Sequence, residues 1–112
     1  VYSEANHPPF VVANGDRTKN IIYMNVSPSQ TVNLSALGSM DPDGNNLSYI
    51  WWNYKEAGTY TNNVNIVNPN SSEASVTIPI DAAGKEIHIV VSVADDGVPN
   101  NTRYRRIVMN VQ

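Results

Sequence analysis

Two acidic turns hold the residues best suited to metal chemistry in this sequence. Residues 41–44 read Asp-Pro-Asp-Gly, and residues 95–97 read Asp-Asp-Gly. Calcium takes about six to eight oxygen ligands from carboxylates, amides and carbonyls. An Asp-x-Asp turn offers two carboxylates and a backbone carbonyl, so these turns predict a calcium site if the fold brings them to one end.

An immunoglobulin-like strand order would bring the turns together, because the loop before the third strand and the loop after the sixth strand share one end. Asp95 or Asp96 would then add a carboxylate, and Asn6 an amide oxygen. Carboxylates gathered there would repel one another strongly without a cation. The alternative is equally open: both sequences are ordinary turns, in which Asp caps its own backbone and Gly supplies a positive φ.

Aromatic residues form the second candidate site. In the run 47–54, side-chain alternation puts Leu47, Tyr49 and Trp51 on one face and Ile50, Trp52 and Tyr54 on the other. By analogy with sandwiches that bury a tryptophan on the third strand, Trp51 is expected in the core. Trp52 and Tyr54 are then expected on the outer face.

Exposed aromatic rings on a strand suit a flat sugar-binding platform, because sugar rings present apolar C–H faces that stack on such side chains. The predicted carbohydrate-binding residues are Trp52, Tyr54, Tyr60, Tyr104 and Arg106. Tyr60 and Tyr104 are its outlying members, and Arg106 supplies hydrogen bonds. Large exposed apolar patches usually mark an interface, so the alternative is that Trp52 packs on a neighbouring domain or under the Asn-rich loop 61–70.

The elements that position these residues have the periodicity of strands. Short apolar or alternating runs, separated by turn residues, recur along the chain. They cover residues 10–12, 21–26, 31–35, 47–54, 64–67, 74–78, 86–94 and 103–111. Only residues 79–84 suggest a helical turn, with Gly84 as its stop. The prediction is an all-β, immunoglobulin-like antiparallel sandwich of about seven strands, with residues 1–9 as an N-terminal linker and 10–112 as one domain.

Composition excludes several classes of function. The chain has 112 residues, no cysteine and a net charge of −3, so thiolate metal sites are impossible and a basic nucleic-acid footprint is missing. Its basic cluster 103–106 is expected to be solvated strand residues. No run approaches the roughly 20 apolar residues of a membrane span. His7 and His88 share no ligand spacing, and no Gly-x-Ser-x-Gly motif occurs, so we expect no zinc site and no enzyme.

Several segments resemble the PKD and cadherin-like superfamily of extracellular modules. They are Asn6-His7-Pro8-Pro9, residues 31–34, Asp41-Pro42-Asp43-Gly44 with the strand to Trp51, and residues 93–97. This resemblance implies calcium ligands at Asn6, Asp41, Asp43 and Asp95. The chain departs from typical PKD domains, since Trp52-Asn53-Tyr54 stands where Trp-Asp-Phe-Gly-Asp-Gly would continue after Trp51.

A closer resemblance adds residues 51–60, 82–88 and 102–106 and covers nearly the whole chain. Together they are similar to the C-terminal domain of bacterial proteins described as cellulose-binding, whose N-terminal part is nucleoside-hydrolase-like. The resemblance implies a fragment of an exported bacterial parent, located outside the cell or in the periplasm.

The expected function is therefore a non-catalytic accessory module of a glycan-processing protein. It would bind a cellulose-like polysaccharide by aromatic stacking, act as a monomer and have calcium as a possible cofactor. The alternative is a spacer or docking domain that packs on the parent's nucleoside-hydrolase-like domain and binds no sugar.

Overall fold

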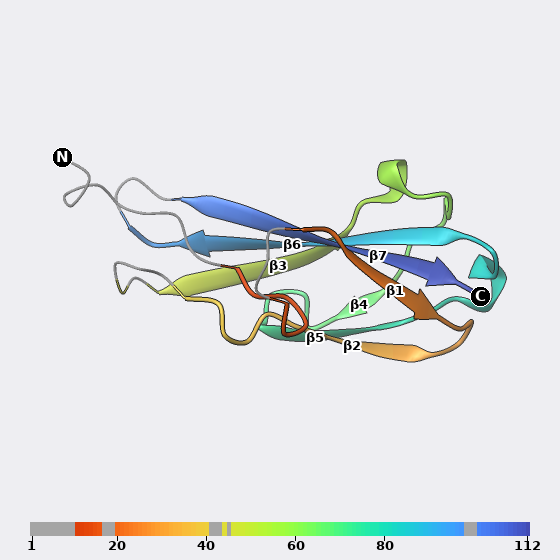
Figure 1. Ribbon diagram of the computed structural model, residues 1–112, viewed down its shortest axis with the longest axis horizontal. Coiled ribbons are helices and arrows are strands. Elements are labelled where there is room, and N and C mark those ends of the chain that lie inside the picture. The colour runs from red at the N-terminus through yellow and green to blue at the C-terminus, as the bar shows by residue number, and fades with distance from the viewer. Residues whose placement is uncertain (1–10, 17–19, 41–43, 45, 98–100) are drawn as a thin grey trace.

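Two sheets packed face to face make up the computed structural model (Figure 1). It describes residues 11–16, 20–40, 44, 46–97 and 101–112. One sheet has the order β1-β7-β6-β3, from strands Ile22–Val26, Thr102–Val111, Glu86–Asp95 and Leu47–Asn53. The other has the order β2-β5-β4, from strands Thr31–Ser35, Glu73–Thr77 and Ile66–Val67. The predicted immunoglobulin-like sandwich is confirmed.

One pairing in the larger sheet differs from the predicted antiparallel pattern. The edge strand β1 runs parallel to β7, with Ile22 opposite Ile107 and Val26 opposite Val111. This pairing is possible because β1 and β2 lie in different sheets, so the chain crosses the sandwich after β1 and does not return as a hairpin neighbour. The molecule is elongated, measuring 51 × 23 × 23 Å.

The core lies between the sheets and follows the alternation of the strands. In β2, Val32 and Leu34 are buried, whereas Thr31 and Asn33 are exposed. Trp51 on β3 is 2% exposed, as predicted for the tryptophan of the third strand. Its indole Nε1 donates a hydrogen bond to the carbonyl of Ser71 at 2.8 Å. A buried tryptophan needs such an acceptor, and this bond joins the larger sheet to the segment leading into β5.

The predicted first strand, residues 10–12, is only partly within the described chain and is wrong there. Phe10 lies outside the described residues, and Val11 and Val12 are buried but belong to no strand. The backbone N–H of Val12 donates to Ser39 Oγ at 2.9 Å, and Ser39 Oγ donates to the Val12 carbonyl at 3.2 Å. A side chain thus satisfies the backbone groups that a neighbouring strand would otherwise pair.

Helical structure in the described residues is limited to two short 3-10 turns. Ile80–Ala82 (η3) follows Pro79 and confirms the predicted turn, with Gly84 beyond it at φ +77°. Lys55–Ala57 (η2) was not predicted. Within the part of the chain that the structure describes, neither turn has the length or hydropathy to cross a membrane.

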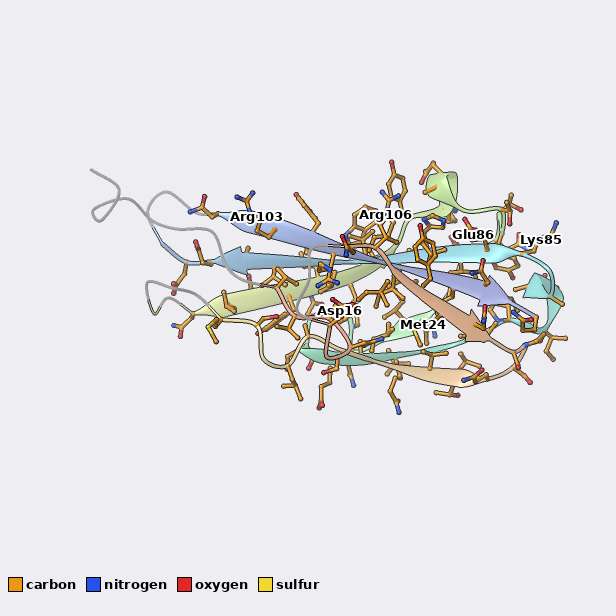
Figure 2. The ribbon with its side chains drawn as sticks, in the orientation of Figure 1. Asp16, Met24, Lys85, Glu86, Arg103 and Arg106 are labelled. Atoms are coloured by element: carbon orange, nitrogen blue, oxygen red, sulfur yellow. The ribbon has the colours of Figure 1, made fainter. Side chains whose placement is uncertain are left out.

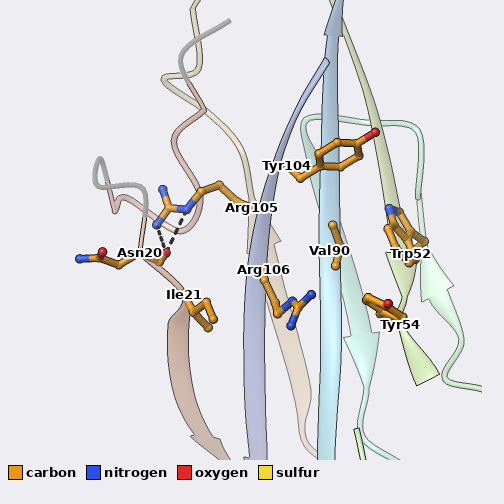
Figure 3. Close-up of a pocket in the computed structure, with 8 residues that line it drawn as sticks. All are labelled: Asn20, Ile21, Trp52, Tyr54, Val90, Tyr104, Arg105 and Arg106. Atoms are coloured by element: carbon orange, nitrogen blue, oxygen red, sulfur yellow. Dashed lines mark hydrogen bonds between the residues drawn. The ribbon is translucent and has the colours of Figure 1, made fainter. Parts of the chain in front are cut away.

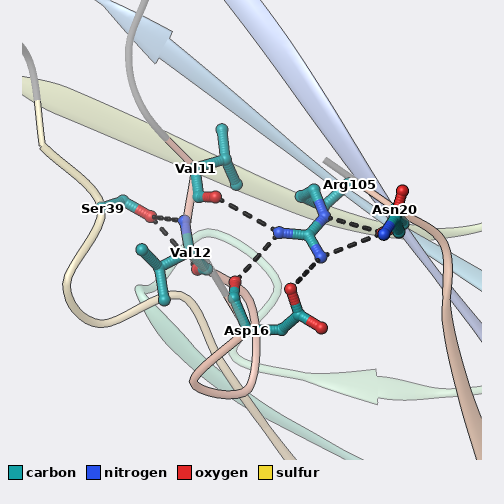
Figure 4. Close-up of polar contacts among 6 residues, drawn as sticks. All are labelled: Val11, Val12, Asp16, Asn20, Ser39 and Arg105. Carbon is teal, nitrogen blue, oxygen red and sulfur yellow. Dashed lines mark hydrogen bonds and ion pairs between the residues drawn. The ribbon is translucent and has the colours of Figure 1, made fainter. Parts of the chain in front are cut away.

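Arg105 corrects the expectation that the basic cluster 103–106 is solvated. It is 4% exposed, because its side chain falls on the inward parity of β7, opposite Val91. Its guanidinium donates to the carbonyls of Val11, Asp16 and Asn20 at 3.4, 3.0 and 3.0 Å, and to the Asp16 carboxylate at 3.0 Å (Figure 4). These bonds fasten the segment before β1 to the centre of the larger sheet.

Replacing Arg105 with methionine should therefore destabilise the domain. The substitution keeps a long apolar stem but removes the donor that binds three backbone carbonyls and a carboxylate, and we expect a loss of about 2–3 kcal/mol. The Asp16 side chain is 38% exposed, so solvent weakens the contribution of its ion pair with Arg105 to the stability. The matched control is Arg103→Met on the same strand, at an exposed position, expected to change stability by less than about 0.5 kcal/mol. Urea unfolding measures both, and equal stabilities of the two variants would contradict this role.

Candidate functional site

The outer face of the larger sheet carries a pocket of about 640 Å³. Strand register builds it, since Trp52, Val90 and Arg106 lie opposite one another across β3, β6 and β7. The next row along the sheet contains Ile50, Ser92 and Tyr104. The pocket is lined by Asn20, Ile21, Trp52, Tyr54, Val90, Tyr104, Arg105 and Arg106 (Figure 3). The structure thus brings together four of the five residues predicted to bind carbohydrate.

Trp52 faces outward, as the alternation predicted, but its ring is held in place. It is half-buried, and its Nε1 donates a hydrogen bond to Ser92 Oγ on β6 at 3.0 Å. The Trp52 and Tyr54 rings have centroids 5.3 Å apart and an interplanar angle of 38°. The guanidinium carbon of Arg106 lies 5.2 Å from the centroid of Tyr54. Each side chain fixes its neighbour, so the surface is largely organised before any ligand arrives.

Tyr104 forms a more exposed part of the same site. It is 63% exposed, and only Ser92 of β6 separates it from Ile50 of β3, which is 53% exposed. In Figure 3 its ring lies over β6, above Val90 and beside the Trp52 side of the pocket. Exposed rings of this kind can stack on a flat ligand, whereas the half-buried pair Trp52 and Tyr54 supplies a fixed base.

Three large apolar residues on this face were not among the site residues predicted from the sequence. They are Ile21, Tyr23 and Ile50, with Tyr23 the most exposed at 68%. Ile50 shares the parity of Trp52, and that signal could have found it. Ile21 and Tyr23 belong to a weakly alternating run, whose outer face became evident only when β1 paired with β7.

The outer side of β2 and β5 is polar, in contrast to the aromatic face. On the outer side of β2 and β5, Thr31 faces Thr77 with hydroxyl oxygens 3.2 Å apart. Asn33 and Ser75 form the next pair. Figure 2 shows Arg106 projecting from the outer side of the larger sheet, whereas Met24 points between the two layers.

Tyr60 does not belong to this face, and the expectation that it is exposed is wrong. It is 7% exposed and packs in the core, because its backbone N–H and that of Thr59 both bond to the Glu86 carbonyl and draw the segment against β6. Its hydroxyl donates to Asp81 Oδ1 at 2.7 Å. The pKa of Tyr60 is raised above its ordinary value. The bond to the carboxylate is the largest cause, and burial is the next.

The strand that follows the first acidic turn pairs with the strand that leads into the second. Leu47 at the start of β3 pairs with Asp95 at the end of β6. Asn46 extends this contact, since its backbone N–H donates to Asp96 Oδ1 at 3.0 Å. Residues 41–43 lie outside the described residues, so the meeting of the two turns themselves stays a prediction.

The ligands themselves are only partly described. Asn6, Asp41 and Asp43 lie outside the described residues. Asp95 is 3% exposed, and its Oδ1 accepts hydrogen bonds from the backbone N–H groups of Gly97 and Asn101 at 3.1 and 3.0 Å. Asp95 thus caps the turn after β6. Among the residues whose structure is described, no three His, Asp or Glu side chains gather closely enough to hold a metal, and calcium remains a prediction.

His88 is buried despite its outward parity on β6. It is 8% exposed, and its Nε2 lies 2.6 Å from Glu86 Oε1. Gly58 lies over it so closely that a Cβ at this position would stand 2.5 Å from the Glu86 carbonyl and 3.3 Å from the imidazole. His7 lies outside the described residues. The His88 carbonyl accepts a hydrogen bond from the Tyr54 backbone N–H at 2.9 Å, which fastens the start of the 54–60 segment to the sheet.

One of the solved structures similar to this chain matches it along its whole length. It is a nucleoside hydrolase-related hypothetical protein from Saccharophagus degradans that is associated with carbohydrate metabolism. The two are 48% identical with a TM-score of 0.97, and the match covers 100% of this chain but 27% of that protein. The PKD domain from KIAA 1837 protein is 18% identical, with a TM-score of 0.55 over 82% of this chain and 81% of that one, and shows the fold alone.

The family comparison agrees with the structural one. No curated protein matches the chain. Residues 31–111 match the family model described as cellulose-binding protein Sde0182, C-terminal domain. This match covers most of the chain and includes every strand of the sandwich except β1. The chain therefore belongs to the family of C-terminal domains of Sde0182-type cellulose-binding proteins.

Proposed function

We propose that this domain is a non-catalytic accessory module that binds polysaccharide by stacking sugar rings on the outer face of its larger sheet. The observation that carries the proposal is the convergence of Trp52, Tyr54, Tyr104 and Arg106 on one pocket. Trp52 and Tyr54 lie far from Tyr104 and Arg106 in the sequence, and the pairing of β3 and β7 with β6 brings the two segments together. An apolar pocket with a few polar groups is the usual form of a small-ligand site.

The chemistry of the pocket suits a pyranose ring better than a reacting substrate. The apolar C–H face of a sugar can lie on Trp52 or Tyr104, while its hydroxyls accept hydrogen bonds from Arg106 and bond with the Tyr54 hydroxyl. Val90 is 4% exposed and gives the site an apolar floor. Asn20, which also lines the pocket, adds an amide at its edge. A site of this kind binds a chain segment by shape and stacking and needs no catalytic group.

The comparisons give this binding a context. The related protein from Saccharophagus degradans is associated with carbohydrate metabolism, and this chain corresponds to 27% of its length. An exported parent protein with a processing domain would gain by tethering, because a second attachment site raises the effective concentration of the substrate. Weak affinity at each site is sufficient for that purpose.

A second candidate function is docking on the remainder of such a parent protein. Its support is the apolar surface beyond the pocket, where Tyr23 is 68% and Ile50 53% exposed. Large exposed apolar patches commonly mark protein interfaces. In this case the sandwich would be a spacer packed against a nucleoside-hydrolase-like domain, and it would bind no glycan.

Substitution of Trp52 by alanine separates the two functions. If sugar rings stack on this residue, its removal should weaken binding to cello-oligosaccharides or soluble β-glucan about tenfold, which is about 1.4 kcal/mol. The matched control is Tyr23→Ala, which removes a more exposed ring from the same sheet without touching the pocket. Calorimetric titration measures the affinities, with circular dichroism to verify folding. Absence of glycan binding by the unaltered domain, or equal losses in both variants, would count against stacking at Trp52.

We also propose that calcium stabilises the end of the sandwich where the acidic turns meet. Support comes from the pairing of Leu47 with Asp95, which joins the start of β3 to the end of β6. Asp41 and Asp43 would supply carboxylates, Asn6 an amide oxygen, and Asp95 the remaining carboxylate. The donor types are those that calcium prefers.

Removal of calcium should then lower the thermal stability. Binding to the folded state alone contributes about 2.7 kcal/mol when free calcium is a hundredfold above its dissociation constant. Melting curves of metal-free protein, verified by elemental analysis, should shift upward when calcium is restored but not when magnesium is added. Asp43→Asn should abolish the shift, whereas Asn70→Asp, a charge change on an exposed residue after β4, should retain it. Coincident curves with and without calcium would dismiss the metal.

A further inference from the structure

Arg106 is the cation that the pocket leaves available to a ligand. The other arginine in the lining, Arg105, is 4% exposed and already bound to Asp16 and to backbone carbonyls. Arg106 is half-buried and contacts the Tyr54 ring, with its guanidinium carbon 5.2 Å from the ring centroid. In the described part of the chain, no carboxylate lies within ion-pair distance of Arg106.

The lining as a whole contrasts in charge with the rest of the molecule. The eight residues around the pocket include two arginines and no aspartate or glutamate. Asp16 balances Arg105, so Arg106 leaves the pocket with a local positive charge. The whole chain, in contrast, carries a net charge of −3. A negatively charged ligand that binds here must be attracted by this local charge, because the overall charge of the protein repels it.

From this arrangement, and resting on the proposed glycan-binding function, we infer that the pocket selects polysaccharide chains that carry carboxylate groups, such as those with uronic acid units. A uronic acid ring keeps an apolar C–H face for stacking and holds a planar carboxylate at its edge. Arg106 projects from β7 beside Val90, next to the surface formed by Trp52 and Tyr54. A ring stacked on the aromatic residues can therefore present its carboxylate to the guanidinium.

Two physical features make Arg106 suited to this role. Its planar guanidinium can donate two parallel hydrogen bonds to a carboxylate, a geometry that lysine lacks. Its contact with Tyr54 restrains the side chain before binding, so less rotamer entropy is lost when the ligand is held. A neutral glucan uses the stacking surface as well but gains no charge-assisted bond.

Two polymers with the same β-1,4-glucan backbone test the inference. Hydroxyethylcellulose is neutral, whereas carboxymethylcellulose carries carboxylates. Affinity electrophoresis and calorimetric titration of the 112-residue domain should show about tenfold tighter binding to the carboxylated polymer at low salt, as a charge-assisted hydrogen bond of moderate strength would give. The ratio of the two affinities should fall as salt is raised.

Variants assign that ratio to one side chain. Arg106→Gln should bring the ratio of the affinity for the carboxylated polymer to that for the neutral polymer to about one, because the charged guanidinium is lost. Arg106→Lys, which keeps the charge, should give an intermediate ratio. The control is Arg103→Gln, an exposed residue of the same strand that does not line the pocket. It changes the net charge by the same amount and should leave the ratio unchanged. Melting temperatures verify that each variant is folded.

The outcomes separate this inference from the function on which it rests. Equal binding of both polymers by the unaltered domain would overturn carboxylate selection and leave glycan stacking in place. An equal fall of the ratio in Arg106→Gln and Arg103→Gln would overturn the role of the pocket, since it would reflect overall charge. Matching affinity for a sulfated glucan would also overturn it, because selection would then be for any polyanion. Failure to bind either polymer would reject the glycan-binding function and the inference together.

Discussion

The register of β3 against β6 and β7 is the constraint on which the rest of this structure depends. Val91 faces Trp51 on one side and Arg105 on the other, whereas Val90 faces Trp52 and Arg106. The first row points inward and the second outward. A slip of one residue would exchange the two rows, placing the buried indole and the buried guanidinium in solvent and the pocket residues in the core.

The inward-facing residues Trp51 and Arg105 hold in place the segments that border the pocket on the outer face. Trp51 donates to the Ser71 carbonyl across the sandwich, and Arg105 fastens the segment before β1. That segment ends at Asn20 and Ile21, which form one edge of the pocket. A buried polar network that satisfies its backbone partners thus determines both the position of β1 and the boundary of the binding surface.

Alternation predicted much of this arrangement from the sequence. The immunoglobulin-like sandwich, the inward Trp51 and the outward Trp52 all follow from period-two patterning and strand order. Arg105 was misjudged because a charge at an inward position contradicts the pattern, and only the carbonyls of distant residues explain it. Tyr60 was misjudged because it follows the strand, where parity no longer applies. Its burial follows from the backbone bonds of Thr59 and Tyr60 to Glu86, and its hydroxyl bonds to Asp81 in η3. The roles of Ile21 and Tyr23 depended on the parallel pairing of β1, which short-range patterns do not encode.

The two tryptophans of this chain permit a direct test of the account. Each indole N–H gives its own signal in a nitrogen–proton correlation spectrum, and one lies in the core while the other lies at the pocket. Titration with a soluble β-1,4-glucan oligosaccharide bearing carboxylates should shift or broaden the Trp52 indole signal and leave that of Trp51 in place. Stationary signals from both indoles at saturating glycan, with any shifts confined to residues off the outer sheet face, would contradict the assignment of this surface as the binding site.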